Sequence, residues 1–324
     1  MSSRNSLISL IWCVSGVVIT SSAKEPASLY SYFERFFDQI ESREVKPASI
    51  GNAEIAALMK RANPHELLSF LEPYISSQDV RVRSQALGLQ VKVAELHPSR
   101  QVRQEIVQSL VGGLTSEGQT DRRFHRKYAQ FLLNFTQDDF SEHAKAAIVE
   151  ALQAREPSWR LVLVSGVAQI KETLRRLEEF LFDEVAYAND PNMRLAPEWY
   201  FTLGWHARLA RARMGVQADV EKCLVLLDTL DDVRVFTMSL SDLAYMRQPE
   251  AIECLKRYFL SDLRLAPANP GGMGEPVSNY LMPIMADCLS NFPVKRRDAR
   301  NYSQQERERC RRWVTEQKEW KIRR

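Results

Sequence analysis

Glycine is scarce in this chain, with 12 residues in 324, and the hairpin-forming dipeptides Asn-Gly and Asp-Gly are absent. Runs rich in Leu, Ala, Glu, Arg and Gln outnumber alternating β-branched runs, so the composition favours helix over sheet. Hydrophobic residues make up 45% and charged residues 26%, which is too apolar for a disordered chain. We therefore expect a folded, all-α protein.

The sequence also lacks the short motifs that carry most catalytic and metal-binding chemistry. Its five histidines are scattered, no His-Glu-x-x-His pair occurs, and no paired cysteine motif offers zinc geometry. A Gly-x-Ser-x-Gly elbow is absent, and the nearest echo, Val164-Ser165-Gly166, lies within a predicted helix. We predict no catalytic residue, no metal site and no cofactor, and therefore a protein that is not an enzyme.

Long apolar runs are missing except at the N-terminus. Arg4 precedes an uncharged, mostly apolar stretch from Leu7 to Thr20, and Ser21-Ser22-Ala23 supplies small residues for cleavage. The pattern predicts a signal peptide over residues 1–23 and a periplasmic or extracellular location. A membrane anchor and a buried first helix are the alternatives, but the stretch is short and polar for a span of roughly 20 apolar residues. We expect no stable membrane insertion after cleavage.

Cysteine is rare, and Cys13 would leave with the signal peptide. An even number of remaining cysteines in an oxidising compartment permits disulfides, although spacing does not choose among the three pairings. The alternative is a set of buried thiols that fill helix interfaces, since free cysteine behaves as a small hydrophobe. The remaining cysteines are Cys223, Cys254, Cys288 and Cys310.

Helical periodicity recurs in segment after segment of the rest of the chain. Asn63-Pro64-His65-Glu66 marks a helix start, with Asn63 as N-cap and Pro64 in the first helical position. The helix near 79–96 is apolar on more than one face, so we expect it to be sandwiched. Further helices are predicted near residues 28–41, 52–61, 99–114, 120–135, 139–154, 157–168, 171–187, 197–214, 217–229, 232–246, 249–261 and 276–291. The period of roughly 40 residues per helix pair is typical of helical repeats.

One segment resembles a known repeat family. Asp79 to Leu87 reads Asp-Val-Arg-Val-Arg-Ser-Gln-Ala-Leu, which resembles the HEAT pattern of an acid, then Val-Arg, then Ala. Degenerate copies lie at 156–163, 190–194 and 231–234, and Leu243 to Ile252 is similar to the junction of short HEAT-like repeats also found in phycobilin lyases. The resemblance implies a right-handed α-solenoid of stacked antiparallel helix pairs, HEAT/armadillo-like, over residues 24–294. In such repeats the acid caps the second helix and the arginine packs along its neighbours.

Positive charge gathers at the C-terminus, where Lys295 to Arg324 holds 12 Lys or Arg against 5 Asp or Glu. Ser303-Gln304-Gln305-Glu306 forms a capping box in front of a last helix with one apolar stripe. We predict that residues 295–324 form a basic helix that caps the end of the solenoid. The alternative is a basic amphipathic helix for an acidic membrane or nucleic acid.

Two segments are candidates for contacting a partner. The helix at 197–214 carries Trp199, Trp205, Arg208 and Arg211, and the last three recur at spacings that place them near one side. The loop at 266–276 is rich in glycine but lacks the Lys and Ser/Thr of a phosphate loop. The alternatives are an aromatic core stripe under arginine stems for the helix, and a plain insertion for the loop.

These observations together predict an exported scaffold or adaptor that binds another protein or peptide along its concave face. A solvent-open groove lined by Trp205, Arg208 and Arg211, together with the loop, would instead favour an enzyme or ligand-binding protein. Nucleic-acid binding through a basic face is a third hypothesis. Export and a nearly neutral net charge argue against it, so we expect no nucleic acid.

Overall fold

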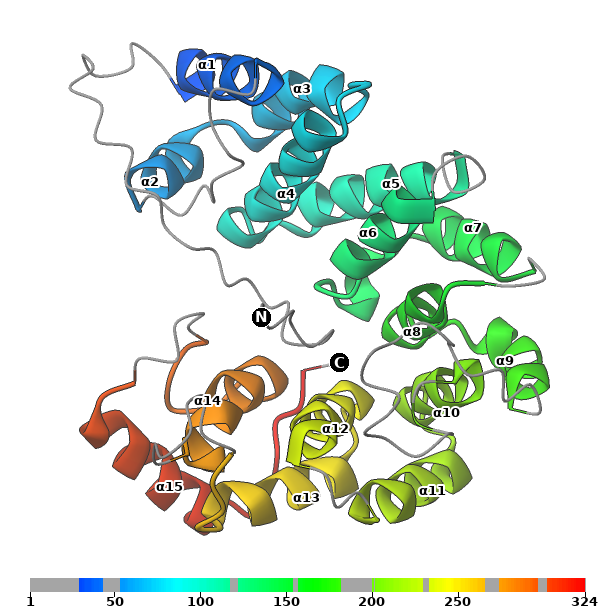
Figure 1. The fold of residues 1–324 in the computed structure, drawn as a ribbon, viewed down its shortest axis with the longest axis vertical. Helices are drawn as coiled ribbons and strands as arrows, with labels where there is room; N and C mark the ends of the chain where they lie inside the picture. Colours follow the sequence, from blue (N-terminus) through cyan, green and yellow to red (C-terminus); the bar gives the residue numbers. More distant parts are fainter. Residues whose placement is uncertain are drawn as a thin grey trace, which may run out of the picture. The chain divides into compact units, whose positions relative to one another are not determined.

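The computed structural model describes residues 29–42, 53–116, 122–153, 157–181, 200, 202–229, 233–265, 274–296 and 302–323. They belong to two compact units, within residues 13–110 and 111–324, here called the N-terminal and C-terminal units. Over these ranges the fold is all-α, as predicted: helices are joined by turns, no strand forms, and two isolated β-bridges occur (Figure 1).

The N-terminal unit is built around one buried helix, α4. The other helices are α1 (Leu29–Glu41), α2 (Ala53–Arg61) and α3 (Pro64–Ile75), and all three pack against α4 (Val80–Leu96). Buried residues of α4 include Val82 and Val93, which share one face, and Leu87, which lies on a different face of the helix. The expectation of a sandwiched helix is therefore confirmed. Aromatic rings join α1 to α3, with Phe37 stacked on Tyr74 at 4.0 Å between ring centroids.

Helix starts in this unit follow the polar residues that the sequence offers. The Asn63 side chain accepts from the backbone N–H of His65 at 3.0 Å, with Pro64 in the first turn. Asp79 caps α4 by accepting from the N–H of Arg81 at 2.7 Å, and the Arg81 guanidinium bonds the same carboxylate. That bond lowers the pKa of Asp79 to about 2, so the cap stays charged over the physiological range.

The C-terminal unit contains the remaining helices, and α5 (Arg100–Ser116) spans the boundary between the units. The helices, with two short 3-10 segments, are α6 (Arg122–Leu132), η1 (Gln137–Asp139), α7 (Glu142–Leu152), α8 (Trp159–Val167), η2 (Lys171–Thr173), α9 (Leu174–Phe180), α10 (Leu203–Arg213), α11 (Gln217–Asp228), α12 (Val233–Met246), α13 (Pro249–Leu260), α14 (Val277–Cys288) and α15 (Gln304–Glu316). The helix predicted at 197–214 begins at α10 because Thr202 accepts from the N–H of Trp205 at 3.0 Å. Residues 182–199 lie outside the described residues.

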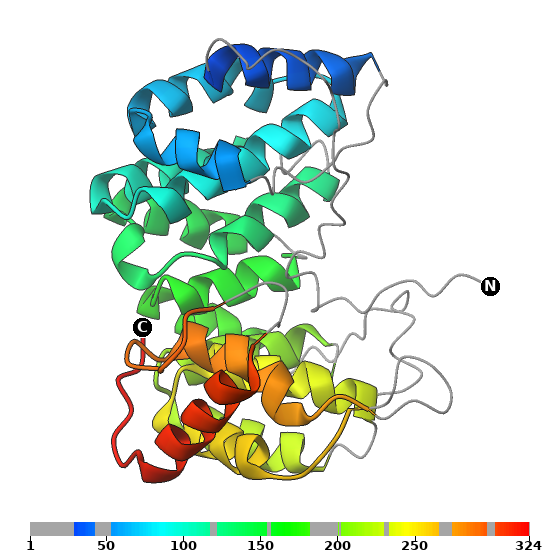
Figure 2. The same ribbon diagram turned by 90° about the vertical axis from the view of Figure 1, so that its left-hand side faces the viewer.

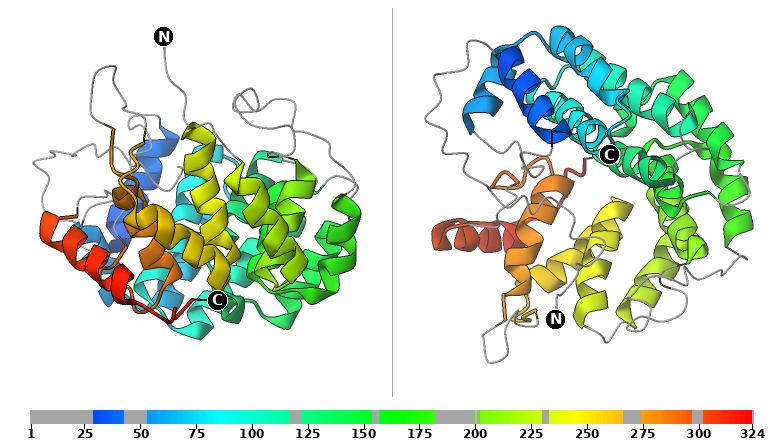
Figure 3. Two further views of the ribbon diagram at one scale, coloured as in Figure 1. Left: turned by 90° about the horizontal axis from the view of Figure 1, so that it is seen from below. Right: turned by 45° about the horizontal axis from the view of Figure 1, so that its top comes forward.

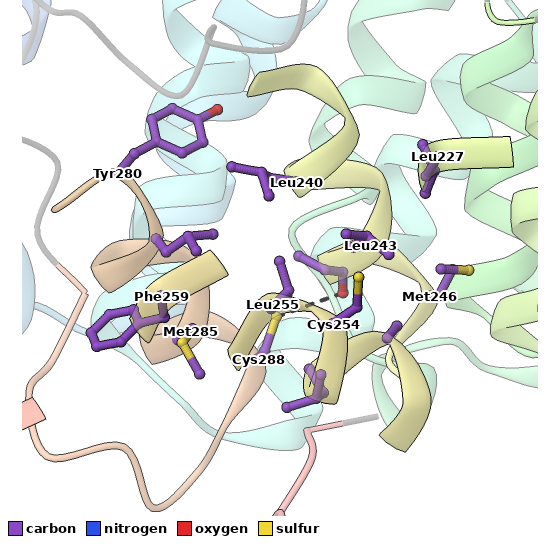
Figure 4. Packing of buried hydrophobic residues seen from close by; sticks show 14 of the residues in the cluster. Leu227, Leu240, Leu243, Met246, Cys254, Leu255, Phe259, Tyr280, Met285 and Cys288 are labelled. Carbon is purple, nitrogen blue, oxygen red and sulfur yellow. Dashed lines mark hydrogen bonds between the residues drawn. The ribbon is translucent and has the colours of Figure 1, made fainter. Parts of the chain in front are cut away.

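Contacts in the C-terminal unit run mainly between helices that are close in the sequence. Helix α10 packs against α8, α9, α11 and α12, and α13 packs against α11, α12, α14 and α15. Figure 2 shows α12 to α15 gathered together at the end of this unit, coloured yellow to red. Their shared core is a continuous apolar cluster, in which Leu243, Leu255 and Met285 come from three successive helices (Figure 4).

The end of the chain is tied back onto this core. The predicted capping box of α15 is present: the Glu306 N–H donates to Ser303 Oγ at 3.2 Å, and the Ser303 N–H donates to Glu306 Oε2 at 2.8 Å. Helix α15 lies beside α14 and α13 (Figure 3). In the tail after α15, Ile322 forms an isolated antiparallel β-bridge with Leu289, which follows α14. Among the helices described, none has the length and apolar character to cross a membrane.

Candidate functional site

The sequence-predicted site residues on α10 turn inward rather than toward solvent. Trp205 is 4% exposed, and its indole Nε1–H donates to Asp242 Oδ2 on α12 at 3.2 Å. Trp199 lies outside the described residues. Trp205 therefore occupies an aromatic core position, which was the alternative interpretation of the sequence. It is not an exposed anchor for a partner.

Arg208 and Arg211 meet at a single carboxylate on the next helix. Arg208 Nη1 lies 2.9 Å from Asp219 Oδ1, and Arg211 Nε lies 2.6 Å from Asp219 Oδ2. The Asp219 side chain is 5% exposed. A buried carboxylate held by two guanidiniums joins α10 to α11, and removing it would leave two partly buried cations without that partner. These arginines act as structural ties, so the open groove expected of a ligand site at Trp205, Arg208 and Arg211 does not form.

Asp242 is the centre of a buried polar cluster that the sequence did not reveal. Its Oδ2 accepts from Tyr200 Oη at 2.6 Å as well as from Trp205. Burial raises the pKa of Asp242 to about 7, although the two hydrogen bonds act in the opposite direction. Burial and the nearby Asp242 carboxylate raise the pKa of Tyr200. Asp242 therefore titrates near neutral pH, but the surrounding helices enclose it.

A second buried polar group, His206, follows Trp205 on α10 and packs against α8. Its Nδ1 lies 2.7 Å from the Thr202 carbonyl oxygen, and its ring stacks on Trp159 at 4.6 Å between centroids. Burial is the largest cause that lowers the pKa of His206 to about 4, with the Arg160 charge acting in the same direction. The imidazole is therefore neutral at physiological pH and serves packing between α8 and α10.

Helices α8, α10 and α12 approach closely where Gly166 faces Tyr245. The Tyr245 hydroxyl donates to the Leu163 carbonyl oxygen at 2.5 Å, and Arg213 Nη1 donates to the Tyr245 carbonyl oxygen at 2.7 Å. A Cβ at Gly166 would lie 2.3 Å from the Tyr245 hydroxyl oxygen, so a side chain there would displace this contact. The polar groups at this crossing hold three helices together.

The four cysteines of the C-terminal unit are free and buried. They are buried thiols that fill helix interfaces, which was the alternative to disulfides in the sequence analysis. Cys288 Sγ lies 3.6 Å from the Ala244 carbonyl oxygen, which joins α14 to α12 (Figure 4). Burial raises the pKa of Cys288 and of Cys310 to about 11, and it also raises that of Cys223 and of Cys254. Thiolate character is therefore suppressed at neutral pH. Over the described residues, no group of three or more His, Cys, Asp and Glu is placed to hold a metal ion.

A surface depression of about 650 Å³ lies where α13 ends and α14 and α15 begin. Its positive charges are Arg264, before α14, and Arg307 and Arg311, one turn apart on α15. The other lining residues are Asp262 and Glu308, the polar Ser261, Ser278, Asn279 and Gln304, and the apolar Phe259, Pro276 and Met282. A concave site with converging polar and charged groups has the character of a binding site.

Sequence reasoning pointed to the neighbourhood of this depression but missed its residues. Of the loop predicted to contact a partner, 266–276, only residues 274–276 are described, and Pro276 lines the depression. Within this loop, the Gly274 carbonyl oxygen accepts a hydrogen bond from Arg264 Nη1 at 2.7 Å. Arg264 also forms an isolated antiparallel β-bridge with Pro276. The i, i+4 spacing of Arg307 and Arg311 was the available signal.

Comparison of the chain with protein-family models, with curated proteins and with solved structures finds no match. The candidate site is therefore inferred from the geometry of these residues alone.

Proposed function

We propose that the chain is a HEAT-like α-solenoid that acts outside the cytoplasm as a scaffold or adaptor for another protein. The observation that carries the proposal is the order of helix packing in the C-terminal unit, where α10 and α13 each contact helices that flank them in the sequence. Solenoids have this contact pattern because each repeat is stabilised by its neighbours. They use the extended surface that results for binding.

Two details of the repeats support the HEAT-like assignment. Asp79 caps α4, as the resemblance implies for the acid, and Arg81 Nη2 donates to the Glu41 carbonyl oxygen of the neighbouring α1 at 3.3 Å. In the degenerate copy at 156–163, Ser158 takes the capping role by accepting from the Leu161 N–H at 3.2 Å. Arg160 is buried there and lies against the Trp159 ring, at 4.1 Å from its centroid. The burial of Arg160 agrees with the packed arginine that the pattern implies.

The C-terminal helix has the properties of a solenoid cap. Cys310 and Val314 of α15 are fully buried, whereas Arg311 and Arg312 between them are exposed. After α15, the Ser290 N–H donates to the Lys321 carbonyl oxygen at 2.9 Å, and the Arg323 N–H donates to the Cys288 carbonyl oxygen at 2.8 Å. A terminal repeat must cover its apolar inner face with a polar outer one, and residues 302–323 meet that requirement.

The test is affinity capture of the full-length, C-terminally tagged chain from its native host after fractionation. We expect the exported fraction to contain a chain that begins at Lys24, together with one stoichiometric protein partner, both identified by mass spectrometry. The matched control is the chain without residues 1–23, which should stay in the cytoplasm and recover no such partner. An uncleaved cytoplasmic chain that recovers nucleic acid or a small molecule would contradict both the location and the function.

A further inference from the structure

The depression beside α15 has a charge pattern that indicates what it binds. We propose that it is the docking site for an acidic peptide segment of the partner protein, with carboxylates at the arginines and apolar side chains at the exposed Leu263 beside them. This inference rests on the proposed function, since it supplies the chemistry by which the scaffold would recognise another protein.

The three arginines are oriented by backbone carbonyl groups, which hold a guanidinium in place without neutralising it. Arg264 Nη1 donates to Gly274 O at 2.7 Å, Arg307 Nη1 to Tyr302 O at 2.7 Å, and Arg311 Nη2 to Leu260 O at 2.6 Å. A guanidinium has five N–H donors in a planar fork that matches a carboxylate. Bonds of this kind leave the charge available and reduce the entropy that a ligand must overcome on binding.

The acidic residues of the site compete only weakly with a ligand. Asp262 Oδ1 lies 3.5 Å from Arg311, but its side chain is 100% exposed, so this surface ion pair contributes little. Glu308 accepts a hydrogen bond from Gln304 Nε2 at 2.9 Å. Three positive and two negative side chains leave a net positive site.

The size and lining of the depression also fit a peptide better than a bare ion. Its volume of about 650 Å³ is within the range of about 300–1,000 Å³ that is typical of sites for organic ligands. Phe259 and Met282 are nearly fully buried, so the apolar contact that an inorganic anion cannot use comes from a neighbouring residue. Leu263, next to the site, is a large hydrophobic residue that is 50% exposed. Alternating acidic and apolar side chains would therefore satisfy both parts of the surface.

The direct test uses a fluorescein-labelled hexapeptide that alternates glutamate and leucine, titrated with the chain from residue 24 onward and followed by fluorescence anisotropy. We expect saturable binding that the same peptide with glutamine in place of glutamate does not show. In R264Q and in R311Q, Kd should rise about tenfold, the loss expected for one charge-assisted hydrogen bond. R307K, which keeps the charge but not the fork, should weaken binding less than R307Q.

The control variant is R312Q, because Arg312 is an exposed arginine of α15 that does not line the depression. Its Kd should match that of the unmodified chain, and all variants should share one thermal unfolding midpoint. An equal loss in R312Q, or no saturable binding at all, would overturn the proposal. Displacement of the peptide by inorganic phosphate at concentrations where acetate has no effect would overturn it in favour of a phosphate site.

The two proposals can fail separately. If the R264Q/R311Q double variant still captures the host partner while it loses the hexapeptide, the scaffold function stands and the assigned docking site is wrong. If the unmodified chain binds the hexapeptide through these arginines but captures no protein from its host, the site stands and the scaffold function is wrong. Loss of both partner and peptide in the double variant, and of neither in R312Q, is the result that we expect.

Discussion

Asp242 is a carboxyl group whose environment makes the stability of the protein depend on pH. It is 7% exposed and accepts hydrogen bonds from Tyr200 and Trp205. Because burial raises its pKa from 3.8 to about 7, the folded protein holds this proton more tightly than the unfolded chain does. The resulting stabilisation is fully present below about pH 3.8, and it is lost as the pH rises through about 7.

The substitution Asp242→Asn removes this titration and keeps an oxygen that can accept from Tyr200 and Trp205. We expect the free energy of unfolding of the variant, relative to the unmodified chain, to rise by roughly 2–4 kcal/mol between pH 4 and pH 8. Urea unfolding followed by circular dichroism at several pH values measures this difference. A constant difference across the range would show that folding does not raise the pKa of Asp242.

The matched control for that measurement is Asp262→Asn, because the Asp262 side chain is fully exposed. It should leave the pH profile unchanged. The buried His206 adds an opposite dependence to every variant: its pKa is lowered from 6.5 to about 4, so its contribution is present above about pH 6.5 and lost as the pH falls through about 4. Comparison of each variant with the unmodified chain at the same pH removes this shared contribution.

Helix boundaries were the part of the fold that the sequence predicted well, because caps are local. Asn63, Asp79 and Ser303 each bond a backbone N–H two or three residues ahead, so the residues that decide the boundary are adjacent in the sequence. Most predicted helices accordingly end within a few residues of the observed ones. The fold class followed from the same local patterns.

The roles of the α10 side chains could not be predicted, because their partners are distant in the sequence. Trp205 bonds a carboxylate 37 positions away, and Arg211 bonds one 8 positions away on another helix. Periodicity places Trp205, Arg208 and Arg211 on α10 but does not say what faces them. The depression was missed for the same reason, since Arg264 and Arg311 come together only when α13 and α15 pack.

The capping box of α15 offers a test at the level of one element. Substitution of Ser303 by Ala removes the acceptor for the Glu306 N–H and should destabilise the helix by about 1 kcal/mol. Hydrogen exchange of the amides in α15 should become faster, because they exchange through local opening. The substitution Gln305→Ala, at an exposed position inside the first turn, is the control and should leave exchange unchanged. Equal exchange rates in the two variants would contradict a stabilising role for the box.

At the scale of the whole molecule, the separation into two units and the neighbour-by-neighbour packing lead to a prediction about truncation. A chain that begins at Ser99 keeps α5 and every helix of the C-terminal unit. The proposed repeat architecture leads us to expect that it stays helical and unfolds cooperatively, because stability in such an architecture is approximately a sum of local contributions. Thermal unfolding followed by circular dichroism, together with size-exclusion chromatography, is the measurement.

Removal of the other end should have a different effect, although it takes away fewer residues. A chain that stops at residue 302 loses α15 and its tail, and so exposes the apolar cluster that Cys310 and Val314 join, including Phe259 and Phe292. Exposed core surface of this kind promotes association, so this truncation should elute as soluble aggregate and unfold at a lower temperature than the Ser99 truncation. If both truncations behaved alike, α15 would be an ordinary repeat helix and not a cap. A monomeric, fully stable chain without α15 would show that the cluster is covered by other residues.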